Sequence, residues 1–157
     1  MKTAVPLVGL AISIASALAA DPPPINQVED ILELIPAGVR PVGKKEWDAS
    51  SLAAASKSLT ENTAGRTATL RLSIRPITEV PKGEFPVRIV DETFQFHGKV
   101  YRIDCICTFP ESAYAALMKA KASDRFKISG TITECSLGLF GRIPNVIFRM
   151  KDCAATR

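Results

Sequence analysis

The stretch VYRIDCICTFPESAYAALMKAKASDRFKISGTITE, residues 100–134, changes its hydrophobic period twice. In VYRIDCICTF one alternating set of residues is apolar, which is typical of a half-buried strand. Pro110 then opens a segment whose larger apolar residues, from Tyr114 to Met118, recur at helical spacing. Alternation returns in RFKISGTITE. The stretch therefore predicts a strand, a helix and another strand in succession.

Further strands are predicted on both sides. TATLRLSIRPI (67–77) and FPVRIVDETFQF (85–96) alternate before the stretch, and a break near Asp91 and Glu92 indicates a β-bulge. NVIFRMKD (145–152) alternates after it. The predicted inward-facing residues are Ala68, Leu70, Leu72, Ile74, Tyr101, Ile103, Cys105, Cys107, Phe109, Phe126, Ile128, Gly130, Ile132, Val146, Phe148 and Met150.

The element order is three strands, one helix and two strands. This is the order of the OB-fold, a five-stranded Greek-key barrel with a helix between strands three and four. We therefore expect an α+β, mainly β protein with an OB-fold barrel over residues 66–157. An ordinary α+β sheet made from the same elements is the alternative.

Residues 1–20, MKTAVPLVGLAISIASALAA, have the layout of a secretory signal peptide: one basic residue, an apolar run and small residues at the end. The apolar run is short for a membrane span, and an N-terminal anchor is the alternative. We expect an exported protein, periplasmic or extracellular, that is soluble once the signal peptide is removed.

Residues 21–65 form a predicted N-terminal helical extension and linker. NQVEDILELIP reads as a helix with a capping box of Asn26 and Glu29, although a disordered leader is the alternative. DASSLAAASKSLTEN (48–62) reads as a second helix. Trp47, the only tryptophan, is expected to pack where this linker meets the barrel.

Four segments together resemble a known family: SLAAASKSLTENTAGRTATLRLSIRPI, YRIDCICTF, FKISGTITE and VIFRMKDC. They are similar to exported bacterial OB-fold domains described as tRNA-anticodon-binding-like, over about residues 51–153. The match includes a glycine in the fourth strand, Gly130, and the terminal Cys153. Leu72 and Ser73 stand where the family tends to have a first-strand glycine. The resemblance implies an OB-fold and a secreted protein; it implies no enzymatic activity, and "tRNA" describes a shape.

Residues for catalysis are sparse. The only histidine, His97, lies in a predicted turn without an obvious nucleophile, and no Gly-rich phosphate loop is present. The Cys-x-Cys spacing of Cys105 and Cys107 is not a usual zinc signature. We therefore expect no enzymatic activity, no cofactor and no metal.

Four cysteines would enter an oxidising compartment if the chain is exported. Strands three and five of an OB barrel run parallel, so Cys107 and Cys153 can meet. We expect a disulfide between Cys107 and Cys153, with Cys105–Cys153 as the second choice. A Cys105–Cys107 bond is not expected, because strand neighbours two residues apart are near the limit of disulfide reach. Cys135 is either free or paired elsewhere.

Charge is unevenly distributed along the chain. The formal net charge is +4; acidic residues outnumber basic ones over residues 21–65, and the reverse holds over residues 66–157. A basic domain attracts nucleic acids, anionic glycans or membrane surfaces, and an ordinary solubility charge is the alternative.

The stretch SLGLFGRIP, residues 136–144, is expected to be a loop between the last two strands. OB-folds bind ligands on strands two and three and on the adjoining loops. A loop phenylalanine stacks on a base or sugar, and arginine pairs with phosphate; alternatively, the apolar loop residues plug the end of the barrel. The ligand-binding candidates are Arg71, Arg75, Arg88, Arg102, Leu139, Phe140 and Arg142.

The leading functional hypothesis is a non-catalytic binding module of the periplasm or cell envelope. Its partner is an unknown protein or an anionic polymer such as a glycan. An oligonucleotide-binding protein and a structural protein without a ligand are the alternatives.

Overall fold

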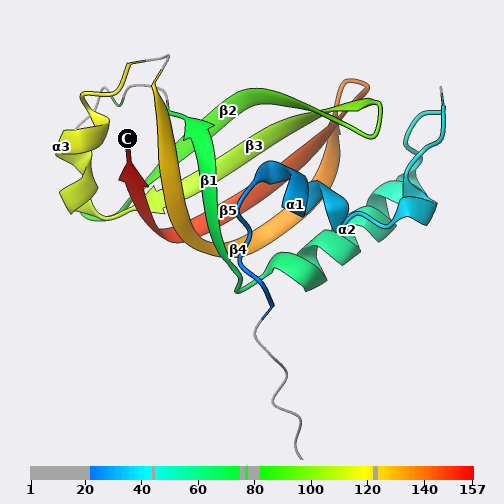
Figure 1. The fold of residues 1–157 in the computed structure, drawn as a ribbon, viewed down its shortest axis with the longest axis horizontal. Coiled ribbons are helices and arrows are strands. Elements are labelled where there is room, and N and C mark those ends of the chain that lie inside the picture. Colours follow the sequence, from blue (N-terminus) through cyan, green and yellow to red (C-terminus); the bar gives the residue numbers. More distant parts are fainter. Residues whose placement is uncertain (1–21, 44, 75–76, 78–81, 122–123) are drawn as a thin grey trace, which may run out of the picture.

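The computed structural model describes residues 22–43, 45–74, 77, 82–121 and 124–157. The predicted signal peptide and Arg75 lie outside these residues. The chain is mainly β, with short helices before the sheet and between two of its strands (Figure 1). The elements are α1 (Val28–Glu33), η1 (Ala37–Val39), α2 (Ala49–Thr63), β1 (Thr67–Ser73), β2 (Phe85–Phe96), β3 (Lys99–Phe109), η2 (Glu111–Ala113), α3 (Tyr114–Leu117), β4 (Arg125–Phe140) and β5 (Ile143–Thr156).

The five strands form one mixed sheet in the order β1-β4-β5-β3-β2. The β3–β5 pair is parallel, and the other neighbouring pairs are antiparallel. Within the described residues no ladder joins β1 to β2, so the sheet is not closed. The expected bulge in β2 is confirmed by a register shift between Val90 and Glu92. Two further shifts in the β4–β5 ladder accompany the curvature of these long strands in Figure 1.

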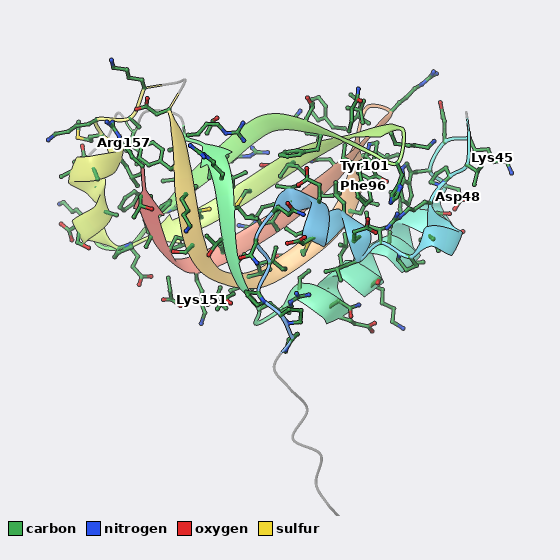
Figure 2. All side chains as sticks on the ribbon, viewed as in Figure 1. Lys45, Asp48, Phe96, Tyr101, Lys151 and Arg157 are labelled. Atoms are coloured by element: carbon green, nitrogen blue, oxygen red, sulfur yellow. The ribbon has the colours of Figure 1, made fainter. Side chains whose placement is uncertain are left out.

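The predicted core is confirmed. Apart from Gly130, every residue predicted to face inward is at most 2% exposed. The N-terminal helices contribute to the same core through Val28, Ile31, Leu59 and the largely buried Trp47. Phe96 and Tyr101, labelled in Figure 2, make an edge-on ring contact at 6.2 Å near the end of the β2–β3 hairpin. Burial of these side chains removes apolar surface from water and is the main force holding helices and sheet together.

The N-terminal helix begins one residue later than predicted. Asp30, rather than Glu29, turns back to the start of α1, where its carboxylate accepts hydrogen bonds from the backbone amides of Asn26 (2.9 Å) and Gln27 (3.2 Å). The cap residue is Gln27. The capping box is therefore present, but with Gln27 and Asp30 in place of Asn26 and Glu29.

Helix α2 packs along the edge of β4 beyond the point where the pairing with β1 ends. The β1–β4 ladder stops at Thr67 and Thr131. Beyond it, the hydroxyl of Ser56 donates to the carbonyl of Leu137 and accepts from its amide, both at 2.9 Å. The Thr60 hydroxyl donates to the carbonyl of Cys135 at 2.8 Å. Hydroxyl groups on one helix face thus satisfy backbone groups that a neighbouring strand would otherwise pair.

The helix between β3 and β4 is shorter than expected. The sequence predicts one continuous helix after Pro110, and the structure has η2 followed by the four-residue α3. Leu117 is fully buried, so this short connection still contributes to the core. None of the helices in the described parts of the chain has the length and apolarity that crossing a membrane requires.

Gly130 lies where β5 packs tightly against β4. A Cβ atom at this position would sit 2.8 Å from the carbonyl oxygen of Lys151 and 2.9 Å from the Sγ of Cys153. Both distances are shorter than real Cβ contacts, and one partner is backbone that cannot rotate away. The fourth-strand glycine is therefore required by packing.

We predict that Gly130→Ala lowers the free energy of unfolding by about 1 to 3 kcal/mol, because the added methyl group overpacks the β4–β5 contact. Gly138→Ala is the matched control on the same strand, since nothing lies within 4 Å of its would-be Cβ. Urea unfolding followed by circular dichroism measures both. Equal stability of the two variants would contradict the packing argument.

Candidate functional site

The stretch SLGLFGRIP is not the expected loop. Strand β4 continues to Phe140 and β5 starts at Ile143, so only Gly141 and Arg142 form the turn. Phe140 and Ile143 are direct partners in the ladder. Gly141 has a φ of 62°, the left-handed conformation that a two-residue hairpin turn requires. The apolar side chains are therefore held on a paired hairpin.

The hairpin divides its apolar residues between the core and the surface. Leu137 is 5% exposed, and its backbone is bonded to Ser56 of α2. Leu139, Phe140 and Ile143 are 44%, 59% and 40% exposed. The plug alternative therefore holds for Leu137 alone, and three large apolar side chains remain in contact with water.

Phe140 shares its face of the sheet with residues of β3. The guanidinium carbon of Arg102 lies 3.9 Å from the centre of the Phe140 ring, a cation–π contact. Arg102 pairs with Asn145 in the parallel ladder, and the same register continued by two residues brings Val100, 42% exposed, toward Ile143. We call Val100, Arg102, Phe140 and Ile143 the tip surface. Leu139, next to Phe140 in the strand, points to the opposite face.

Arg88 is committed to an ion pair within the fold. Its Nε donates to Asp104 Oδ1 at 3.0 Å and its terminal nitrogen donates to Oδ2, a two-pronged arrangement. The Asp104 side chain is only 4% exposed, whereas that of Arg88 is 62% exposed. The Arg88 hydrogen bond holds the pKa of Asp104 below its ordinary value of 3.8, against the opposing effect of burial. Arg88 therefore serves mainly to keep a buried carboxylate ionised.

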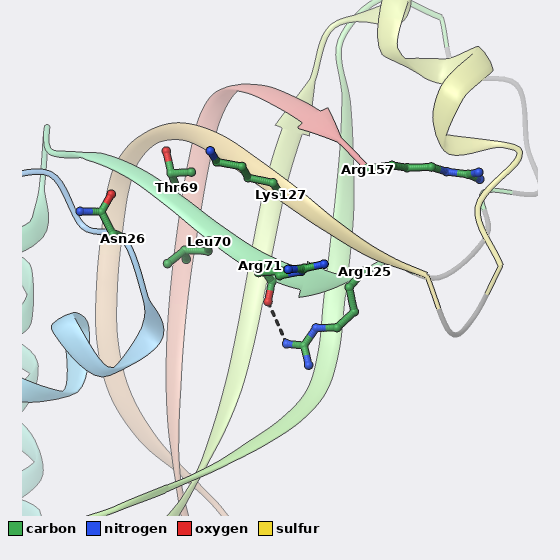
Figure 3. Close-up of a pocket in the computed structure, with 7 residues that line it drawn as sticks. All are labelled: Asn26, Thr69, Leu70, Arg71, Arg125, Lys127 and Arg157. Carbon is green, nitrogen blue, oxygen red and sulfur yellow. Dashed lines mark hydrogen bonds between the residues drawn. The ribbon is translucent and has the colours of Figure 1, made fainter.

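The remaining predicted site residues lie in different places. Arg142 forms an exposed ion pair with Glu46 of the N-terminal segment at 3.6 Å. Arg71 lines a pocket on β1 and β4, away from the hairpin tip (Figure 3). The structure thus brings together Arg102 and Phe140 only. The sequence analysis did not predict Val100 and Ile143 as site residues. Each is the strand neighbour of a buried residue, Tyr101 or Pro144, so alternation places it on the exposed face.

The expected disulfides are absent: all four cysteines are free, buried thiols. The Sγ atoms of Cys105 and Cys107 lie 3.2 Å apart, so the neighbours considered unfavourable for pairing are in hydrogen-bond contact. Cys107 also contacts Cys153; this hydrogen bond is the main cause of a strongly raised pKa for Cys153. Cys105 is the main cause of the raised pKa of Cys107. Cys107 and Cys153 are thus neighbours, as predicted, but the predicted disulfide between them is wrong.

Metal-ligating side chains do not converge in the parts of the chain that the structure describes. No three His, Cys, Asp or Glu side chains there are arranged to hold a metal ion. His97 lies in the turn between β2 and β3, where its Nε2 is 3.4 Å from a Glu33 carboxylate oxygen. That contact joins the hairpin to α1 on an exposed surface.

Comparisons with protein-family models, with curated proteins and with solved structures gave no match to this chain. The resemblance to tRNA-anticodon-binding-like domains therefore stays a prediction from the sequence. The function is therefore inferred from the geometry of the described residues alone.

We predict that Arg88→Leu lowers the free energy of unfolding by about 1 to 3 kcal/mol at neutral pH, because it leaves a buried carboxylate without its hydrogen bonds. Lys57→Leu is the control: its ion pair with Glu61 at 3.9 Å is exposed on both sides and should contribute about 0 to 1 kcal/mol. Chemical unfolding of both variants tests this. A loss for Lys57→Leu as large as that for Arg88→Leu would contradict it.

The same pair predicts a dependence on pH. The pKa of Asp104 is lowered in the folded state, so its stabilising contribution is present above 3.8 and is lost as the pH falls through the folded pKa. The difference in stability between the wild type and Arg88→Leu should therefore be full at neutral pH and shrink below 3.8. Unfolding series in acidic buffers measure it.

Burial predicts that the thiols are unreactive in the folded protein. Burial raises the pKa of Cys135 to about 12, so about one part in ten thousand is thiolate at pH 8. Ellman's reagent should label no thiol of the native protein within minutes and should label all four in concentrated guanidinium chloride. A count of two in the denatured protein would mean that a disulfide forms after all.

Proposed function

We propose that this protein is a non-catalytic, exported binding module built on an OB-type barrel, and that it engages a partner protein through the tip surface. Support for the barrel comes from the strand order: β1-β4-β5-β3-β2, with β3 and β5 parallel, becomes the OB-fold order once β1 meets β2. The helix between β3 and β4 agrees with this assignment.

The observation that carries the proposal is the exposure of Phe140 and Ile143 on a hairpin with a well-paired backbone. Apolar residues exposed next to one another mark interaction sites more often than single exposed ones do. The position also combines an aromatic ring with a guanidinium group, Arg102, and both residue types are enriched where interfaces gain most of their binding energy. A preformed hairpin reduces the ordering cost of association.

A protein partner is favoured over a nucleic acid for a specific reason. Single-strand binders stack successive bases on several aromatic side chains. Of the aromatic residues on β2, β3 and the hairpin tip, Phe96 and Tyr101 are buried and Phe94 is partly buried, whereas Phe140 is exposed. An oligonucleotide remains the second candidate because Arg102 and Phe140 form one stacked pair.

We predict that Phe140→Ala weakens partner binding at least tenfold and leaves the free energy of unfolding within about 0.5 kcal/mol, as expected for an exposed side chain. Met118→Ala, 45% exposed at the end of α3, is the matched control and should change neither quantity. Amide NMR spectra of the mature protein are recorded with an envelope extract, with single-stranded DNA and with anionic glycans in turn.

Shifts confined to the tip surface, lost in Phe140→Ala and insensitive to salt, support a protein partner. Binding to DNA that weakens steeply with salt supports the oligonucleotide candidate, because phosphate contacts release counterions. A large loss of stability in Phe140→Ala without any binding would leave the residue a structural role and overturn the proposal.

A further inference from the structure

A second surface, at the other end of β4 from the tip surface, gathers positive charge. A pocket of about 520 Å³ lies over β1 and β4, and Figure 3 shows cationic side chains along it. Its lining comes from three separate parts of the chain: the segment before α1, the paired ends of β1 and β4, and the residue after β5. The lining residues are Asn26, Thr69, Leu70, Arg71, Arg125, Lys127 and Arg157.

Two of these cations are direct cross-strand neighbours. Arg71 and Lys127 oppose each other in the β1–β4 ladder, and both are exposed. Arg125, two residues before Lys127, shares its face of the sheet. Like charges placed directly opposite each other on a sheet destabilise it. The arrangement therefore costs the fold stability unless a counter-charge occupies the surface.

The structure supplies little counter-charge. Asp124 lies beside the pocket, but it accepts a hydrogen bond from Arg157 at 3.1 Å. Within the described residues neither Arg71 nor Lys127 has an ion pair. Arg71 and Lys127 are thus two exposed positive charges on paired strands, and the pairing of the strands keeps them close together.

The other two cations both donate hydrogen bonds to backbone carbonyls. Arg125 donates to the backbone carbonyl of Arg71 at 2.9 Å (Figure 3). Arg157 donates to the carbonyl of Lys119 at 3.0 Å and lies over the ring of Phe126 at 5.7 Å. These contacts fix the positions of the two guanidinium groups, and Arg157 also forms an ion pair with Asp124. Fixed donors are the preorganisation that an anion site needs.

The uncharged groups on this face are hydroxyls and an amide. Thr69 and Asn26 line the pocket, and Ser73 and Ser129 occupy the same outward face of the two strands. Among the described residues that line the pocket there is no aromatic ring. The surface therefore offers charge and hydrogen bonds and no stacking platform, which suits an oxyanion better than a nucleobase.

We propose that the pocket formed by Arg71, Arg125, Lys127 and Arg157 binds the phosphate groups of a phosphorylated ligand. A phosphate ester carries close to two negative charges and three acceptor oxygens near neutral pH, which matches the two cations that have no ion pair. Arginine forks bind phosphate through paired hydrogen bonds, and lysine contributes a point charge. The proposal does not depend on the tip surface, since the two sites lie at opposite ends of β4.

Inorganic pyrophosphate, titrated into the mature protein at low salt, is the first probe. We predict binding with a Kd below about 1 mM, read from amide and arginine Nε shifts at Arg71, Arg125 and Lys127, and weakened by added salt as screening requires. The double variant Arg71→Gln/Lys127→Gln should weaken binding at least tenfold. Arg142→Gln, which removes an exposed arginine at the distant hairpin turn, is the matched control and should leave the Kd unchanged.

Thermal unfolding separates a binding role from a structural one. Without ligand, the double variant should melt at the same temperature as the wild type or higher, because a like-charge contact is removed. At a pyrophosphate concentration ten times the wild-type Kd, the melting temperature should rise for the wild type and for Arg142→Gln but not for the double variant, because only bound ligand stabilises the folded state. A lower melting temperature of the ligand-free double variant would assign these residues to the fold and overturn the proposal.

A second experiment tests whether the phosphate belongs to a lipid headgroup or to a soluble ligand. Vesicles of phosphatidylglycerol are compared with vesicles of neutral phosphatidylcholine in a sedimentation assay. Binding to the anionic vesicles that needs Arg71 and Lys127 assigns the phosphate to a lipid headgroup, and pyrophosphate binding without it assigns the phosphate to a soluble ligand. No response to either probe, or equal losses in Arg142→Gln and in the double variant, would overturn the proposal.

Discussion

The parallel pairing of β3 with β5 is the constraint on which the rest of the structure depends. Parallel neighbours cannot be joined by a tight turn, so the chain must cross over between them. Here the crossover consists of η2, α3 and the whole of β4, which then pairs with β5 as well. One ladder thereby places Arg102 next to Asn145 at its start and Cys107 next to Met150 at its end. The tip surface and the contacting thiols of Cys105, Cys107 and Cys153 therefore lie at opposite ends of the same parallel ladder.

Strand length explains why two unrelated surfaces occur on one small domain. β4 has 16 residues and β5 has 14, and both run well past the strands that flank them. At one end the pair carries the exposed hairpin. At the other it meets β1, where the cations of the two strands face each other. A long curved hairpin in a short chain thus separates an apolar surface from a basic one.

Much of the fold could be predicted because its signals are local. Alternation identified the buried face of β1, β3, β4 and β5, and the residues with side chains in that set are buried without exception. The hairpin at Gly141 was missed for a physical reason: Pro144 ordinarily marks the end of a strand, yet here it lies inside β5. The basic pocket was missed because the opposition of Arg71 and Lys127 depends on register, which no single segment reveals. The capping box shifted by one residue because Asp30 and Glu29 are chemically equivalent candidates.

The hydroxyl groups of α2 have a consequence for how the molecule behaves toward copies of itself. An unpaired strand edge is a template on which another chain can add a strand. Ser56 and Thr60 occupy that edge of β4 with side chains rather than with backbone. Helix α2, which belongs to the predicted N-terminal extension, thus covers the edge of β4 and prevents another strand from pairing there. A chain cut at the boundary near residue 65 would expose the backbone amide and carbonyl of Leu137 together with the core surface that the helices cover, and both favour self-association.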